Sequence, residues 1–214
     1  MIFMKKFLKE MNFDNIRKYK KPCLITLSGL PGSGKTYVAK ELSKDLGIFV
    51  LSNDYVRNYF YKYESGMSFE QIQKNVDKIN KERLLKIILN RKSFVFDADL
   101  NTCEKFQRFI KISDMFNYEL IKIKLNSNDD NNIDRILKRV MDYDMFDYNV
   151  IGDNVHYSSS YDRDTYYDIK SRKPQYIDDN YFDYVIDNFG TKEELKCKIN
   201  EISTDIGSCL TLKK

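Results

Sequence analysis

The sequence predicts one α/β domain whose parallel sheet carries helices on both faces. Short apolar runs that are typical of buried strands alternate along the chain with longer stretches whose apolar residues repeat at helical spacing. Near residue 30, a strand, a glycine-rich loop and a helix follow one another directly. A chain of 214 residues is long enough to bury a full core. We therefore expect right-handed crossovers between successive strands.

The glycine-rich loop is the most informative stretch of the chain. It matches the phosphate-binding pattern G-x-x-x-x-G-K-[ST] without a mismatch and consists of Gly29, Leu30, Pro31, Gly32, Ser33, Gly34, Lys35 and Thr36. Its glycines let backbone N–H groups close around a polyphosphate without clashes from Cβ atoms. The pattern predicts that Lys35 reaches the β- and γ-phosphates and that the Thr36 hydroxyl binds Mg²⁺. A nucleoside triphosphate, ATP or GTP, is the expected partner.

The residues around the loop favour this interpretation. An apolar run at 23–27 predicts a short buried strand, and apolar residues at helical spacing follow Thr36. In this order the loop amides and the helix dipole point at one anion site. The alternative is a glycine-rich turn with an unrelated lysine, but such a turn would not require a strand before it and a helix after it.

Composition narrows the classes of partner and site. The net charge of +4 arises from charges of both signs, so it permits a phosphorylated or nucleic-acid partner without requiring one. The four cysteines include no C-x-x-C pair, so we expect reduced thiols in a cytoplasmic protein, two of them in the core. The single histidine, His156, excludes a metal site built from several histidines.

The predicted domain occupies residues 21–206, between a helical extension at 1–20 and a frayed tail at 207–214. The apolar residues of 1–20 are interrupted by lysines and are too few for a signal peptide or a membrane span. An amphipathic helix that packs on the domain is the preferred interpretation, and a helix on a membrane surface is the alternative. No membrane partner is expected elsewhere, because no other long apolar segment occurs.

The second strand, expected at 48–51, leads directly into two charged residues. Asp54 suits the N-cap of the next helix, and Arg57 shares its face three residues later. In a parallel α/β sheet, the carboxyl ends of the strands face the ligand crevice. Asp54 and Arg57 are therefore candidates for binding substrate, and an ordinary cap with a surface ion pair is the alternative.

A long helix at 68–92 and a buried strand at 93–96 are expected next. The helix opens with a capping box and carries a regular apolar face, so we assign it to the scaffold. The strand ends at Asp97. In proteins with a phosphate-binding loop, an acid at this place often lies near Mg²⁺, so Asp97 is a candidate for the metal shell or for binding a substrate hydroxyl. Asp99 is equally suited to capping the helix expected at 104–117.

A fourth strand, expected at 118–125, precedes a helix that begins with acids at 129 and 130. Arg135 and Arg139 lie one turn apart on this helix and share a face. In phosphoryl transfer, arginines so placed neutralise charge on the moving phosphoryl group. A charged solvent face is the alternative. We expect a helical lid over about 129–160.

Residues 140–180 lack regular periodicity and are rich in Asp and Tyr. They form either a lid with a substrate-binding surface or a polar loop with half-buried rings, and the sequence leaves both open. A fifth strand is expected at 182–186, and a capping box at 191–194 begins the last helix.

On these motifs the chain resembles P-loop kinases of the polynucleotide kinase and zeta-toxin group, over about residues 24–199. The resemblance is greatest to the kinase domain of phage polynucleotide 5′-hydroxyl kinases. It rests on four segments: residues 29–36, residues 53–57, residues 97–101, and Arg135 with Arg139. It implies a three-layer P-loop NTPase fold with a five-stranded parallel sheet in the order 2-3-1-4-5. It also implies transfer of the γ-phosphoryl group of ATP to a hydroxyl.

The resemblance assigns roles to individual residues. The aspartate after the second strand is the general base on the attacking hydroxyl in that family, which implies this role for Asp54. Arg57 would assist at the acceptor, and Arg139 would contact the transferring phosphate. Arg135 would join Asp54, Arg57 and Asp97 in binding substrate, while Lys35 would steady the β,γ-oxygens.

The 5′-hydroxyl of a polynucleotide is the acceptor that this resemblance favours. The sequence departs from the family pattern at 98–99, where Ala-Asp replaces Thr-Asn, and at Val140, where glycine is common. A small-molecule or nucleotide-sugar kinase of the zeta-toxin kind is the first alternative. A non-catalytic nucleotide-binding ATPase module is the second.

Overall fold

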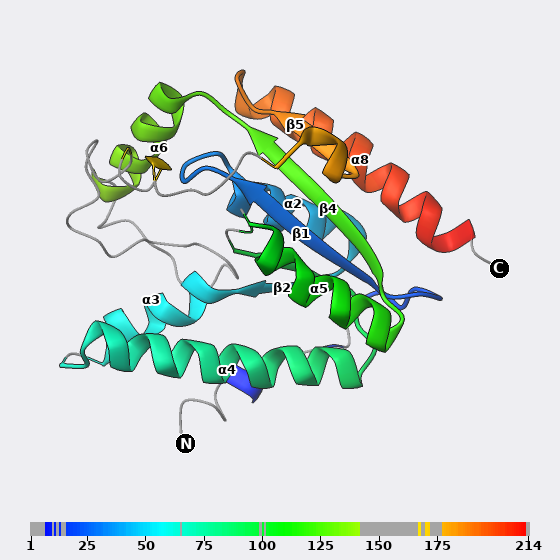
Figure 1. Cartoon of the computed structure of the whole chain (residues 1–214), viewed down its shortest axis with the longest axis horizontal. Coiled ribbons are helices and arrows are strands. Elements are labelled where there is room, and N and C mark those ends of the chain that lie inside the picture. Colours follow the sequence, from blue (N-terminus) through cyan, green and yellow to red (C-terminus); the bar gives the residue numbers. More distant parts are fainter. Residues whose placement is uncertain are drawn as a thin grey trace.

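The protein is represented by a computed structural model (Figure 1). It describes residues 7–9, 11, 13, 16–64, 66–98, 100, 102–141, 167, 170–171 and 177–212.

The core element is a five-stranded sheet in which every neighbouring pair is parallel. Its strands are β1 (Cys23–Gly29), β2 (Phe49–Ser52), β3 (Phe94–Asp97), β4 (Glu119–Asn126) and β5 (Tyr184–Asp187). They lie in the order β2-β3-β1-β4-β5. The predicted fold class and strand order are therefore confirmed.

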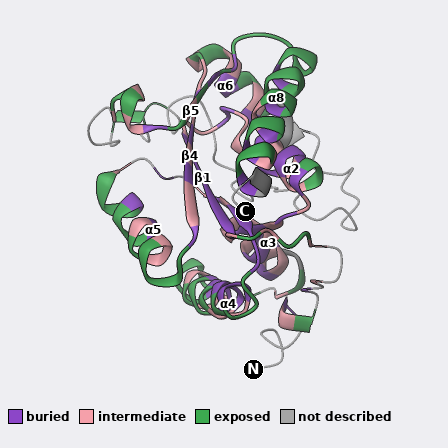
Figure 2. Ribbon diagram, turned by 90° about the vertical axis from the view of Figure 1, so that its right-hand side faces the viewer, coloured by how far each residue is buried: buried purple, intermediate pink, exposed green. Residues whose placement is uncertain are grey.

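Four helices cover the two faces of this sheet. They are α2 (Lys35–Leu46) and α8 (Lys192–Leu212) on one face, and α4 (Phe69–Leu89) and α5 (Cys103–Phe116) on the other. Figure 2 shows the sheet edge-on between these two layers, with the buried residues turned inward. Successive side chains of a strand point to opposite faces, so Ile25 packs among α2 and α8 while Leu24 packs among α4 and α5.

The helices α3 (Asn53–Tyr63) and α6 (Asp129–Met141) follow β2 and β4 at their carboxyl ends. Figure 1 shows both at the end of the molecule toward which the strands point. The short 3₁₀ helix η1 (Asp179–Tyr181) precedes β5. This edge of the sheet therefore gathers the loop, both helices and the predicted site residues.

The N-terminal segment packs on the domain where it is described. Phe7 is 2% exposed and joins the apolar cluster of α3 and α4. Its ring meets that of Tyr59 edge-on, with centroids 5.1 Å apart. Within the described ranges, no helix has both the length and the apolar composition needed to cross a membrane.

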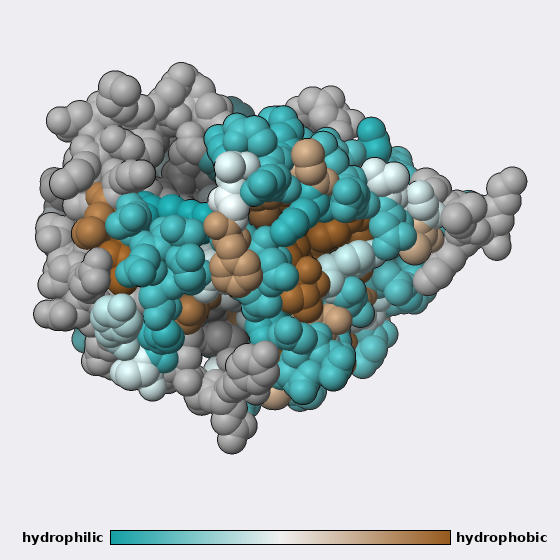
Figure 3. All heavy atoms as spheres, turned by 90° about the horizontal axis from the view of Figure 1, so that it is seen from above, coloured by the Kyte–Doolittle hydropathy of each residue, from teal (hydrophilic) through white to brown (hydrophobic). Residues whose placement is uncertain are grey.

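Three local expectations differ from the structure. Ser52, not Asp54, caps α3, because its Oγ accepts from the N–H of Tyr55 and the helix begins at once after the strand. Of the four cysteines only Cys23 is buried, whereas two were expected in the core. Helix α8 continues past Ile206 to Leu212, because Ile206 and Leu210 both pack in the core beneath it. Figure 3, seen from above, shows that the coloured part of this face is mainly hydrophilic, with apolar side chains grouped near the middle and at one side.

Candidate active site

The phosphate-binding loop joins β1 to α2 through backbone conformations that favour glycine. Gly32 has a φ of 78° and Gly34 a φ of 100°, both in the left-handed region. A Cβ atom on Gly32 would lie 2.4 Å from the backbone oxygen of Asn132. The loop therefore packs against the start of α6 as closely as a residue without a side chain allows.

The N-terminus of α2 suits an anion. Its N-cap is Gly34, which provides no side-chain hydrogen bond, and its first turn contains no acidic residue. The first N–H groups of a helix have no intrahelical acceptor, and the helix dipole adds positive potential at this end. The loop and the helix together therefore fit the phosphates of a nucleotide.

Lys35 and Thr36 occupy the first turn of α2. The Lys35 ammonium donates to the backbone oxygens of Gly29, at 2.8 Å, and of Leu30, at 2.9 Å. The Thr36 hydroxyl donates to Oδ1 of Asp97 at 3.3 Å. Asp97 is only 7% exposed and ends β3, the neighbour of β1. The two candidate metal residues therefore lie together, and their oxygens are of the kind that Mg²⁺ prefers.

Arg135 links α6, the loop and the turn after β5. Its Nη1 donates to the backbone oxygen of Gly32 at 3.3 Å, and its Nη2 donates to Oδ1 of Asn188 at 3.4 Å. Asn188 Nδ2 in turn donates to the backbone oxygen of Ser33 at 2.8 Å. Burial lowers the pKa of Arg135 because it disfavours the charged form, yet an arginine stays protonated in proteins. Arg135 therefore holds a positive charge against the loop backbone.

Asp54 and Arg57 form an ion pair on the first two turns of α3. The side chains are 23% and 22% exposed, so the pair is partly buried. Arg57 Nη2 also donates to Oε1 of Gln73 on α4 at 3.1 Å. Gln73 Nε2 then donates to Oδ1 of Asp77 at 2.8 Å. A continuous polar chain therefore runs from Asp54 across to α4.

The strand register places the two acids at the same edge. Ser52 on β2 pairs with Asp97 on β3, and Asp54 follows Ser52 by two residues. The next strand along is β1, which ends in the phosphate-binding loop. The candidates for donor binding and acceptor activation are thus at the carboxyl ends of three adjacent strands, where ligands bind in such sheets.

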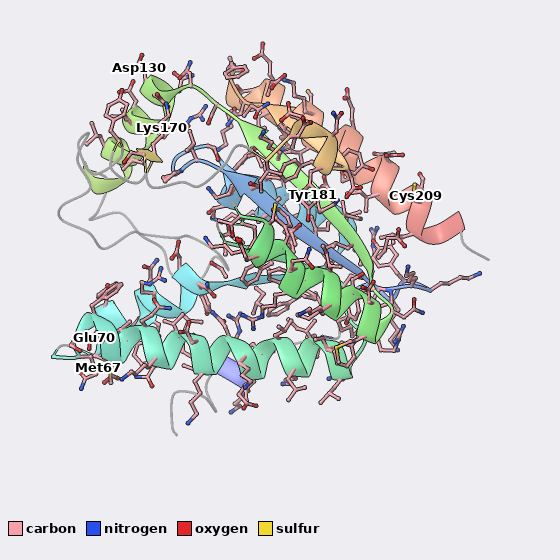
Figure 4. The ribbon with its side chains drawn as sticks, in the orientation of Figure 1. Met67, Glu70, Asp130, Lys170, Tyr181 and Cys209 are labelled. Carbon is pink, nitrogen blue, oxygen red and sulfur yellow. The ribbon has the colours of Figure 1, made fainter. Side chains whose placement is uncertain are left out.

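Some predicted site residues lie partly or wholly outside the described residues. Arg139 belongs to α6, but its side chain is among those not described, and so are Asp99 and all of 142–160 of the expected lid. From the Asp- and Tyr-rich segment, Lys170 is described, and its Nζ donates to Asp129 at the start of α6. Figure 4 shows Lys170 beside this helix, near Asp130.

Two contributors to the site were not expected from the sequence. Asn188 lies directly after β5, at the same edge as Asp97, and that position was the available signal. Gln73 lies near the start of α4, a helix assigned to the scaffold, and nothing in its spacing sets it apart. Its contact with Arg57 depends on how α3 folds back along α4.

A comparison with protein families matches residues 25–156, more than half of the 214, to the family described as AAA domain. The chain belongs to the AAA domain family. No curated protein matches it.

Solved structures share the fold of this AAA domain. A candidate kinase from Chloroflexus aurantiacus j-10-fl superposes with a TM-score of 0.61 and 16% identity, covering 86% of this chain and 98% of that one. A gluconokinase from Sinorhizobium meliloti 1021 gives a TM-score of 0.52 and 12% identity, covering 91% of this chain and 97% of the gluconokinase chain. The Mycobacterium tuberculosis APS kinase CysC, solved with AMPPNP and APS, has a TM-score of 0.46 and 14% identity. That superposition covers 87% of this chain and 95% of the APS kinase chain. The first two superpositions show that this chain has the fold of P-loop kinases.

Proposed function

We propose that this protein is a kinase that transfers the γ-phosphoryl group of ATP to a hydroxyl acceptor. The observation that carries the proposal is the Asp54–Arg57 pair, which lies at the same sheet edge as a complete phosphate-binding loop. A module that only binds or hydrolyses the nucleotide has no need of a carboxylate and guanidinium placed for a second substrate.

The donor half of the site would hold the nucleotide and its metal. The loop amides and Lys35 would bind the β- and γ-phosphates, and Thr36 and Asp97 would hold Mg²⁺. Bound Mg²⁺ neutralises charge on the β,γ-oxygens. Lys35 now donates to the oxygens of Gly29 and Leu30, so these hydrogen bonds would be exchanged for phosphate contacts on binding.

The acceptor half would position and deprotonate the hydroxyl. Asp54 would accept the hydroxyl proton, and Arg57 would orient Asp54 and contact the acceptor. Arg139 would neutralise charge on the moving phosphoryl group. GTP remains an alternative donor, because nothing described at the site distinguishes the two bases.

Two kinds of acceptor are candidates. The sequence resemblance favours the 5′-hydroxyl of a polynucleotide. The structure offers support for a small molecule instead, because a pocket of about 390 Å³ adjoins the residues next to Asp54 and Asp97. Such a volume is typical of small-molecule sites. The gluconokinase neighbour is, by its name, a kinase with a small-molecule acceptor.

The decisive experiment is a transfer assay with γ-labelled ATP and Mg²⁺. The acceptors would be 5′-hydroxyl oligonucleotides of DNA and RNA in one set and small hydroxyl metabolites in the other. Label in an organic product supports the kinase and identifies the acceptor class. Label that appears only in inorganic phosphate, whatever the acceptor, refutes the kinase and indicates an ATPase module.

A further inference from the structure

We propose that the pocket between α4 and α5 binds the acceptor, and that this acceptor is a small hydroxyl compound carrying an anionic group. The proposal rests on the kinase function above and names its substrate class. The anionic group is a phosphate, a sulfate or a carboxylate, since each would be recognised by the same chemistry.

The position of the pocket links it to the acceptor half of the site. Its walls include Asn53 and Phe96, which precede Asp54 and Asp97 in the chain. Phe96 faces α4 and α5, whereas Asp97 contacts Thr36 of α2 at the end of the same strand. A ligand in this pocket therefore lies against the carboxyl ends of β2 and β3.

Hydrogen bonds hold the polar wall of the pocket in place. Asn80 is 8% exposed, and its Nδ2 donates to Oδ1 of Asn53 at 2.8 Å. Arg83 donates to Oδ1 of Asn80 at 2.9 Å. Asp77, at the rim, ends the polar chain that begins at the Asp54–Arg57 pair. The wall is thus connected to the proposed base and is fixed before a ligand arrives, which lowers the cost of binding.

The charges of the pocket favour an anion. Lys81 comes from α4 and Arg108 from α5, so two cations approach the pocket from two different helices. In the described part of the chain neither one takes part in an ion pair. Asp77 is the one acid of the lining and already accepts from Gln73. The lining thus carries a net positive charge that is available to a ligand.

The floor and the size of the pocket favour a small organic molecule. Phe96 and Phe109 form an aromatic floor, with ring centroids 4.7 Å apart. A volume of about 390 Å³ lies near the lower limit of ordinary ligand sites. An apolar floor below a cationic rim fits the carbon skeleton and the charged group of one small molecule better than a length of nucleic acid.

Binding can be tested on the full chain with the donor site filled by AMPPNP and Mg²⁺. The probes are ribose 5-phosphate, glycerol 3-phosphate and gluconate, each compared with its neutral counterpart ribose, glycerol or glucose by calorimetry. We expect at least one anionic probe to bind, and its counterpart to bind at least about tenfold more weakly, since hydrogen bonds to charged groups contribute most. Arg108→Gln and Lys81→Gln should each weaken that probe about tenfold.

Matched controls are available on the same helices. Lys111→Gln on α5 and Lys78→Gln on α4 remove an exposed cation outside the pocket and should leave affinity unchanged. The proposal is overturned if no anionic probe binds, if neutral counterparts bind equally well, or if the pocket variants behave like their controls. It is also overturned if 5′-hydroxyl oligonucleotides are the only acceptors that receive label.

The two levels of the proposal fail in different ways. If label is transferred to a neutral acceptor or to an oligonucleotide and no anion binds in the pocket, the kinase function is supported. The assignment of the pocket as the acceptor site is then contradicted. If anions bind in the pocket but label is released only as inorganic phosphate, the kinase function is contradicted. The pocket is then not an acceptor site either.

Discussion

The two halves of the site are built in different ways. The donor half consists largely of backbone groups: the amides of the loop, the N-terminus of α2, and carbonyls that accept from Lys35 and Arg135. The acceptor half consists of side chains from two helices, joined as Asp54, Arg57, Gln73 and Asp77. In the proposed function, the first half would bind the phosphates common to all nucleotides, and the second would discriminate among acceptors.

This difference predicts separate effects of substitution. A change in the donor half should affect nucleotide binding, loop stability and every acceptor alike. A change in the acceptor half should leave nucleotide affinity intact and reduce transfer. Substitutions in each half test this division.

Lys35→Ala should reduce phosphoryl transfer by about a thousandfold or more, since it removes the ammonium group proposed to bind the β,γ-oxygens and two loop hydrogen bonds. The measurement is transfer of label from γ-labelled ATP. Lys44→Ala, at the exposed end of the same helix, is the control. Undiminished turnover in Lys35→Ala would contradict the kinase proposal.

Arg139→Ala should slow the chemical step by about a thousandfold while changing ATP affinity little, because in the proposed mechanism its charge would act on the transferring phosphoryl group. Single-turnover rates and equilibrium binding of AMPPNP separate the two effects. Arg139→Lys keeps the charge and should recover part of the rate. A loss confined to nucleotide affinity would assign Arg139 to ground-state binding.

Asp54→Asn should reduce the single-turnover rate by about a hundredfold, because general-base catalysis contributes on this order. AMPPNP should bind as to the unaltered protein, because Asp54 belongs to the acceptor half. Asp114→Asn, an exposed acid on α5, is the control. If the rate survives in Asp54→Asn, this residue only pairs with Arg57 at the start of α3.

Gly32→Ala should destabilise the fold more than Gly66→Ala, which makes the pair a test of the loop. Both glycines have positive φ, 78° and 109°, but only at Gly32 would the Cβ atom meet backbone, 2.4 Å from the oxygen of Asn132. The clash should lower the free energy of unfolding by about 1–3 kcal/mol beyond the cost of φ alone. Urea unfolding of both variants measures the difference, and equal losses would contradict the packing of α6 on the loop.

Arg135→Ala should weaken AMPPNP binding by about tenfold, because Arg135 holds the loop at Gly32 and orients Asn188. Asn188→Ala should act on the same contacts, so the double variant should lose less than the sum. Asp134→Ala, exposed on the same helix, is the control. Effects that simply add would show that the two residues hold the loop independently.

The donor half and the sheet were predictable because they are encoded locally. Glycines, a lysine and a threonine at fixed spacing specify the loop, and runs such as Cys23–Gly29 specify strands by composition alone. The position of Asp97 at a strand end sufficed to place it near Thr36, as observed at 3.3 Å. The strand order came from resemblance, since hydrophobic pattern alone does not specify it.

The acceptor half resisted prediction because its contacts depend on packing. Gln73 contacts Arg57, and Asn80 contacts Asn53, only because α3 and α4 lie against each other. Asp54 was expected as a cap, but α3 begins at Asn53, directly after β2, so Ser52 takes that place. A two-residue shift of the helix start is within the ordinary uncertainty of element ends.

The most direct test of the account is a single-turnover experiment on the unaltered protein and on Asp54→Asn, with γ-labelled ATP, Mg²⁺ and the acceptor found in the transfer screen. We expect label in an organic hydroxyl product, a rate about a hundredfold lower in Asp54→Asn, and the same affinity for ATP in both proteins. Label found only in inorganic phosphate, at equal rates in the two proteins, would contradict it.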